Sequence, residues 1–266
     1  MSRPTLAIAV NALVLAAALW GCAAPTVDSS SRERVTESDQ TDAERRSRTR
    51  MELASGYYSR GQFDTALDEV KLALAVKPDM AEAYNLRGLI YQSLGEDRLA
   101  EDNYKRALQL NPRDPDTMHN YGWFLCQSKR MPEALAQLQQ AIATPKYPGL
   151  SRSLMVQGVC QARIGALADA ERSLARSYEL DPTSPVTAVN LADVLYRRGE
   201  LERARFYIGR VNAVPEYSNA QTLWLAARIE NKAGNSRGAR DLGRQLRARF
   251  PQAPETRAFE RGRYDD

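Results

Sequence analysis

The residues of this sequence best suited to chemistry are three cysteines, Cys22, Cys126 and Cys160, and a single histidine, His119. A metal site or a catalytic nucleophile needs several such groups together, with a carboxylate or base at a matching spacing. His119 has no carboxylate at such a spacing, and the glycines occur singly instead of forming a phosphate-binding cluster. We therefore expect no enzymatic activity, cofactor, bound metal or small-molecule substrate. His119 is expected to lie at the surface or in a groove.

Cys22 comes directly after an apolar run near the beginning of the sequence. Arg3 and the apolar residues from about Leu6 to Trp20 have the charged start and short hydrophobic middle of a secretory signal. The run ends in Leu-Trp-Gly-Cys22, which resembles a bacterial lipobox. This resemblance implies cleavage before Cys22 and diacylation of its thiol, and Ala23 implies sorting to the outer membrane, facing the periplasm. An ordinary signal with an incidental cysteine is the alternative.

Composition divides the sequence into four parts. Residues 1–21 are expected to be a signal peptide, and residues 22–47 carry too few large apolar side chains to fold, so they are expected to be a flexible tether. A folded array over 48–253 and a tail over 254–266 are expected to follow. The 37 Lys and Arg residues are mixed along the chain with 33 Asp and Glu residues, and the net charge is only +4. This pattern does not favour binding to nucleic acid.

A repeat of 34 residues dominates the sequence after Ser47. Shifting residues 47–80 by 34 positions onto residues 81–114 aligns Gly61 with Gly95 and brings alanines and prolines into the same register. The pattern of small residues, large residues and a closing proline resembles the tetratricopeptide repeat, in which each unit is two antiparallel helices. The resemblance implies an all-α solenoid of about six helix-turn-helix repeats in a right-handed superhelix. Apolar spacings of three and four, as in TALDEVKLALAV, independently predict helices.

Four further units continue the pattern, beginning at Pro115, Ser151, Pro185 and Ala220. A two-residue insertion in the segment TPKYPGLS separates the third unit from the fourth. The sixth unit is degenerate and richer in arginine, as expected of a terminal repeat that faces water. No stretch alternates convincingly with a period of two, so we expect essentially no β-sheet.

Cys126 and Cys160 occupy similar positions in the first helices of the third and fourth repeats. A solenoid packs these helices side by side, and the periplasm is oxidising. The sequence therefore predicts a disulfide between them. The alternative is two buried thiols that act as small apolar groups.

Stacked repeats expose a concave surface lined mostly by the first helices, as the tetratricopeptide architecture implies. An apolar and aromatic lining with few charges suits a bound peptide or helix. Packing between repeats is the alternative role for any one of these side chains. The candidate groove residues are Met51, Tyr58, Asn85, Leu89, Gln92, His119, Trp123, Met155, Val159, Asp193, Tyr196 and Trp224.

The stretch Asn120–Ser153, NYGWFLCQSKRMPEALAQLQQAIATPKYPGLSRS, carries a more specific resemblance. It is similar to the PilF/PilW family of type IV pilus biogenesis and stability lipoproteins. That family combines a lipobox, a short tether, six repeats, an Asn-Tyr-Gly motif in the third repeat and a Tyr-Pro insertion before the fourth. The matching positions here are Cys22, Asn120–Gly122, and Tyr147 with Pro148.

The resemblance implies a pilotin-like role as an outer-membrane lipoprotein. Such a protein binds the type IV pilus secretin subunit, brings it to the membrane and promotes its assembly into a ring. Two other classes stay open: a periplasmic tetratricopeptide scaffold for cell-wall or outer-membrane barrel assembly proteins, and an enzyme or nucleic-acid binder. Which face of the solenoid binds, and which secretin segment is bound, also stay open.

Overall fold

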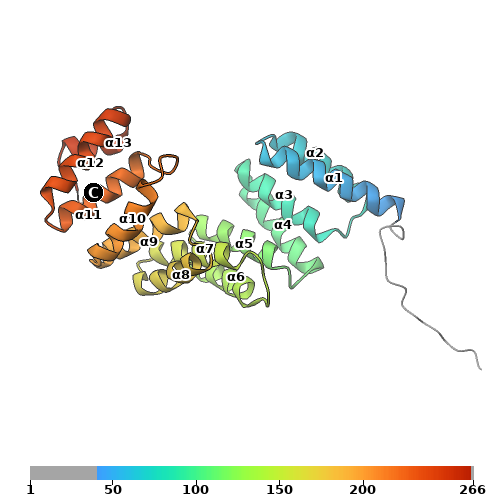
Figure 1. The fold of residues 1–266 in the computed structure, drawn as a ribbon. Helices are drawn as coiled ribbons and strands as arrows, with labels where there is room; N and C mark the ends of the chain where they lie inside the picture. Colours follow the sequence, from blue (N-terminus) through green and yellow to red (C-terminus); the bar gives the residue numbers. More distant parts are fainter. Residues whose placement is uncertain (1–40, 265–266) are drawn as a thin grey trace, which may run out of the picture. The chain divides into compact units, whose positions relative to one another are not determined.

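The computed structural model describes residues 41–264, and these residues form α-helices joined by short loops, with no strand among them (Figure 1). The predicted signal peptide and Cys22 lie outside the described residues. The helices are α1 (Asp42–Ser59), α2 (Phe63–Val76), α3 (Ala81–Ser93), α4 (Asp97–Leu110), α5 (Pro115–Gln127), α6 (Met131–Ala143), α7 (Leu150–Arg163), α8 (Leu167–Leu180), α9 (Pro185–Arg198), α10 (Leu201–Asn212), α11 (Ala220–Lys232), α12 (Ser236–Arg249) and α13 (Pro254–Glu260).

Consecutive helices pair into six hairpins, from α1–α2 to α11–α12. Each first helix also contacts the first helix of the next hairpin, so α1, α3, α5, α7, α9 and α11 lie in a row. This arrangement confirms the predicted all-α tetratricopeptide array.

Glycines allow the two helices of a hairpin to approach closely. A Cβ placed on Gly158 would lie 2.6 Å from Leu174 Cγ and 3.1 Å from the carbonyl oxygen of Ala170. Gly88 and Gly122 occupy the same place in the second and third hairpins, where a Cβ would lie 2.7 and 2.8 Å from the facing side chain. These positions need glycine because the second helix leaves no room for a methyl group.

Replacing Gly158 by alanine is expected to lower the free energy of unfolding by up to about 2 kcal/mol. Overpacking costs about 1 to 3 kcal/mol, which exceeds the gain of about 1 kcal/mol that alanine brings inside a helix. Gly209 is the matched control, because it lies inside α10 with no atom within 4 Å of an added Cβ. Gly209→Ala should stabilise the chain by about 0.5 to 1 kcal/mol. Urea unfolding measures both, and equal effects of the two substitutions would contradict the packing argument.

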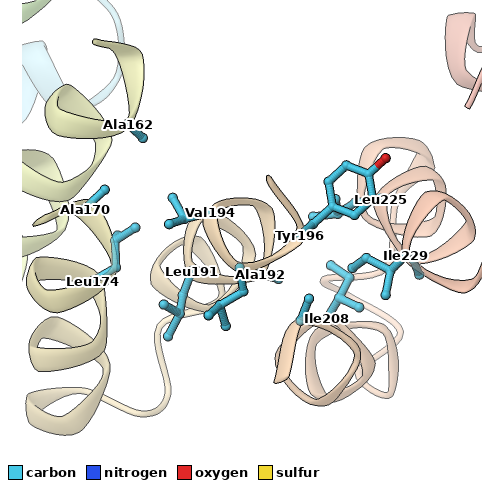
Figure 2. Packing of buried hydrophobic residues seen from close by; sticks show 13 residues of the cluster. Ala162, Ala170, Leu174, Leu191, Ala192, Val194, Tyr196, Ile208, Leu225 and Ile229 are labelled. Carbon is cyan, nitrogen blue, oxygen red and sulfur yellow. The ribbon is translucent and has the colours of Figure 1, made fainter. Parts of the chain in front are cut away.

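The apolar core consists of clusters along the array, and the larger ones span neighbouring hairpins. Its largest cluster combines buried side chains of α7 and α8, of α9 and α10, and of α11, including Leu174, Leu191 and Ile229 (Figure 2). No single hairpin can cover its own apolar face, so each depends on its neighbours for burial.

The two ends of the array differ from the sequence-based boundaries. Helix α1 begins at Asp42, within the predicted 22–47 tether, because Asp42 and Glu44 favour the helix N-terminus and Ser47 is fully buried. In the predicted tail, 254–266, helix α13 packs against α11 and α12. The ring of Phe259 covers Gly243, where a Cβ would lie 1.8 Å from the ring. Both ends of the predicted 48–253 array are therefore extended by ordered residues.

Candidate functional site

The predicted groove residues lie on the first helices of the hairpins, and we call this shared surface the first-helix face. Two of them, His119 and Tyr196, are only 6% and 5% exposed, so the expectation that His119 lies at the surface or in a groove is wrong. The partly exposed members are Met51 and Tyr58 on α1, Asn85, Leu89 and Gln92 on α3, Trp123 on α5, Met155 and Val159 on α7, Asp193 on α9 and Trp224 on α11.

Polar members of the first-helix face bind across neighbouring repeats. Asn120 Nδ2 donates to Asn85 Oδ1 at 3.1 Å, and Gln92 Nε2 donates to Gln127 Oε1 at 2.6 Å. The partners in each pair are 35 residues apart, close to one repeat length. These bonds hold the first helices of the second and third hairpins in register.

Several apolar members act in packing between repeats as well as in lining the face. Leu89 packs against two separate core clusters, and Met155 does the same further along the array. The guanidinium of Arg163 lies over the ring of Trp123, 5.1 Å from its centroid. Leu89 and Met155 therefore pack between repeats, which was the alternative to a role in lining the groove. Val159 belongs to neither of the two core clusters near it.

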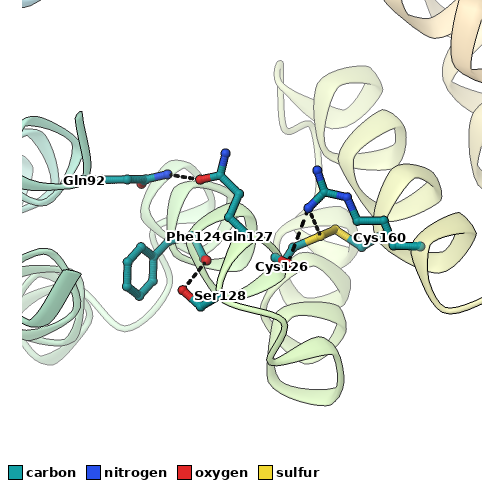
Figure 3. Close-up of a disulfide and its surroundings, with 7 residues drawn as sticks. Gln92, Phe124, Cys126, Gln127, Ser128 and Cys160 are labelled. Atoms are coloured by element: carbon teal, nitrogen blue, oxygen red, sulfur yellow. Dashed lines mark hydrogen bonds between the residues drawn. A yellow bond between two sulfur atoms is a disulfide. The ribbon is translucent and has the colours of Figure 1, made fainter. Parts of the chain in front are cut away.

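Cys126 on α5 and Cys160 on α7 form the predicted disulfide, with their Cα atoms 5.9 Å apart (Figure 3). Both residues are fully buried. Arg163 Nη1 donates to the carbonyl oxygen of Cys126 at 3.4 Å, which adds a second connection between the same two helices. The disulfide joins the third hairpin covalently to the fourth.

Each residue of the Asn120–Gly122 motif has a separate structural role. Asn120 makes the cross-repeat bond to Asn85, and Gly122 permits the close approach of α6 to α5. Tyr121 donates its hydroxyl to Glu101 Oε1 at 2.9 Å. The motif therefore sets how the third hairpin sits against the second.

The Glu101 carboxylate accepts hydrogen bonds from three side chains where the second hairpin meets the third. Lys105 Nζ and Arg130 Nη1 each lie 2.8 Å from a carboxylate oxygen, in addition to the Tyr121 hydroxyl. Burial acts to raise the pKa of the Glu101 carboxyl, but the hydrogen bonds from Lys105, Arg130 and Tyr121 outweigh it and lower the pKa to about 2. The carboxylate therefore stays ionised and links α4 to α5 and to Arg130, the residue that precedes α6.

The Tyr-Pro insertion lines an open pocket of about 610 Å³ between the third, fourth and fifth hairpins. The Tyr147 hydroxyl donates to Asp116 Oδ1 at 3.0 Å, and Arg152 Nη2 contacts the same oxygen at 2.9 Å. The ring of Tyr147 is 7% exposed and packs against Met118. The insertion thus fills the space between α5 and α7 and fixes the loop that joins the two hairpins.

His119 is buried on α5 beside Ser153 of α7. Its Nδ1 lies 2.9 Å from Ser153 Oγ. Burial, with a smaller contribution from the nearby Arg152, lowers the pKa of His119 to about 4, while Asp116 acts to raise it. The imidazole is therefore neutral at neutral pH, where it serves as one more polar link between the third and fourth hairpins.

Stability is expected to fall as the pH drops from about 6.5 to about 4. In this window the unfolded chain takes up a proton at His119 that the folded chain excludes, so acid favours unfolding, by about 3 kcal/mol in all. Below the folded pKa this contribution stops growing. The difference in unfolding free energy between wild type and His119→Gln isolates the effect, and a pH-independent difference would contradict it. His119 is the single histidine of the sequence, so its NMR titration gives the folded pKa directly.

The described residues also contain features that the sequence reasoning did not find. The chain after α13 returns to the first-helix face, where the ring of Tyr264 stacks on Trp224. No signal in the arginine-rich segment around Tyr264 marks this contact, beyond the aromatic residue itself.

Within residues 41–264, no helix is long and apolar enough to cross a membrane.

Family profiles described as tetratricopeptide repeats match residues 81–114, 55–95, 103–143 and 130–185. The type IV pilus assembly protein PilF of Pseudomonas aeruginosa is 30% identical over 210 residues, which span 79% of this chain and 83% of PilF. The chain belongs to the PilF/PilW family. A crystal structure of PilW, described as a widely conserved type IV pilus biogenesis factor, superimposes with a TM-score of 0.75 at 30% identity, over 80% of this chain and 97% of PilW.

A structure of P. aeruginosa PilF superimposes with a TM-score of 0.74 at 27% identity, over 84% of this chain and all of that chain. A tetratricopeptide repeat protein from Parabacteroides merdae, 14% identical, shares the fold alone, with a TM-score of 0.63. PilF/PilW membership makes this chain a homologue of pilus assembly proteins built from tetratricopeptide repeats, an architecture that binds other proteins.

Proposed function

We propose that this protein is an outer-membrane lipoprotein that binds the type IV pilus secretin and promotes its localisation and multimerisation. The observation that carries the proposal is the 30% identity to the pilus assembly protein PilF over 79% of the chain. The lipobox-like sequence at Cys22 supports the anchor, and the disulfide fits an oxidising compartment such as the periplasm.

The first-helix face is the proposed binding surface. It presents partly exposed apolar and aromatic side chains, such as Val159 and Trp123, which suit a bound peptide or helix. Binding the secretin subunit and bringing it to the membrane require no catalytic reaction. A lipid anchor would confine both partners to one membrane, and the resulting rise in effective concentration would let a modest affinity suffice.

The proposal is tested by deleting the gene and assaying heat-stable secretin multimers and surface pili. Loss of both is expected, with recovery on complementation. Normal multimers and piliation would refute the proposed role, and capture of a cell-wall or barrel-assembly protein in place of the secretin would favour the scaffold function.

A matched pair of variants locates the binding surface. Val159→Lys places a charge on the first-helix face, whereas Leu180→Lys places it at the exposed end of a second helix. Because an unpaired charge is costly to bury, Val159→Lys is expected to weaken secretin binding about tenfold or more, and Leu180→Lys to leave it unchanged. Equal effects of both would exclude the first-helix face.

A further inference from the structure

The last described residues of the chain occupy the first-helix face of the final two hairpins. The ring of Tyr264 stacks on Trp224 of α11, with centroids 5.3 Å apart and planes 27° from parallel. Phe259 of α13 meets the same tyrosine edge-on at 6.2 Å. The tyrosine ring of the segment therefore contacts two other aromatic rings.

The backbone of the segment is held as well. Arg228 Nε donates to the carbonyl oxygen of Tyr264 at 2.9 Å, and the Tyr196 hydroxyl lies 3.5 Å from the same oxygen. The contacts thus combine one aromatic ring with one carbonyl group, which are features that any extended peptide with an aromatic residue presents.

Positive charge gathers beside these contacts. The guanidinium of Arg228 and the ammonium of Lys232 lie 4.8 and 4.7 Å from the centroid of the Tyr196 ring. In the sequence, Tyr264 is followed by two aspartates. The positive charge of the site and the two aspartates that follow Tyr264 therefore both favour an aromatic residue followed by acidic residues.

We propose that α9 and α11 form a binding site for an extended peptide that carries an aromatic residue beside carboxylates, and that the chain's own segment around Tyr264 occupies this site in cis. A partner segment of the same chemistry must displace Tyr264 to bind. Because a tethered segment has an effective concentration in the millimolar range, even weak contacts keep it in place. This proposal does not depend on which protein binds the chain in the cell.

A fluorescein-labelled peptide with the sequence of residues 261–266, RGRYDD, tests this site on the full chain. Fluorescence anisotropy is expected to detect binding to Tyr264→Ala, which lacks the tyrosine ring that occupies the site, with an apparent affinity at least tenfold tighter than for wild type. Tyr264→Phe keeps the ring and the carbonyl, so it should exclude the peptide as wild type does. A peptide with alanine in place of tyrosine should not bind.

A further substitution ties the binding to the residues named. Arg228→Gln in the Tyr264→Ala background removes a positive charge and the Nε donor and should weaken peptide binding at least fivefold. Circular dichroism and melting curves establish that each variant is folded. Equal binding to wild type and Tyr264→Ala, no binding to either at millimolar peptide, equal binding of the alanine peptide, or no effect of Arg228→Gln would each overturn the proposal.

Discussion

Replacing Cys126 by alanine is expected to lower the free energy of unfolding by about 4 kcal/mol. The disulfide joins residues 34 positions apart, and closing a loop of this length removes conformational entropy from the unfolded chain. Alanine is chosen because both sulfur atoms are fully buried, where serine would add an unsatisfied hydroxyl. The loss would exceed that of the other stability changes expected above.

Comparison of three variants separates the bond from the packing of the sulfur atoms. Cys126→Ala, Cys160→Ala and the double variant all lack the disulfide, so they should have similar stabilities under oxidising conditions. In a double-mutant cycle, this non-additivity measures the coupling between the two residues. Urea unfolding supplies the energies, and thiol titration of the native chain checks the bond. Additive single effects, or two titratable thiols at these positions, would contradict the disulfide.

Replacing Cys22 by serine is expected to move the protein out of the outer-membrane fraction and to abolish its support of secretin multimers. Serine provides no thiol for acylation, and each buried methylene of an acyl chain contributes about 0.8 kcal/mol to membrane binding. Fractionation and labelling with radioactive palmitate measure the outcome.

Cys126→Ala is the matched control for the anchor, because it removes a cysteine of the folded array and leaves Cys22 in place. It should remain in the membrane fraction and incorporate palmitate. Membrane retention and labelling of Cys22→Ser would show that the lipobox resemblance is misleading.

The repeat array could be predicted from the sequence because the same residue types recur at the same positions in successive repeats. Gly88 and Gly122 lie one repeat length apart, Gly158 follows one repeat plus the two-residue insertion later, and each has the same reason to be small. The spacing of Cys126 and Cys160 likewise places them at neighbouring levels of adjacent first helices, so their pairing follows from the period.

Features that occur only once could not be predicted in this way. Ser47 is buried although its side chain is polar, and Tyr264 docks from a segment that is otherwise polar. His119 gave no sign of burial because its partner, Ser153, belongs to the next repeat. Such contacts depend on how two repeats meet, which a period within one repeat does not specify.

The bond between Cys126 and Cys160 also determines how the array comes apart. Hairpins that contact only their neighbours can fray from either end one at a time. Fraying from the first hairpin or from the last stops at this pair, because the third and fourth hairpins cannot separate while the bond is intact. A protease that nicks the loop 144–149 therefore leaves both fragments attached to each other until a reductant is present.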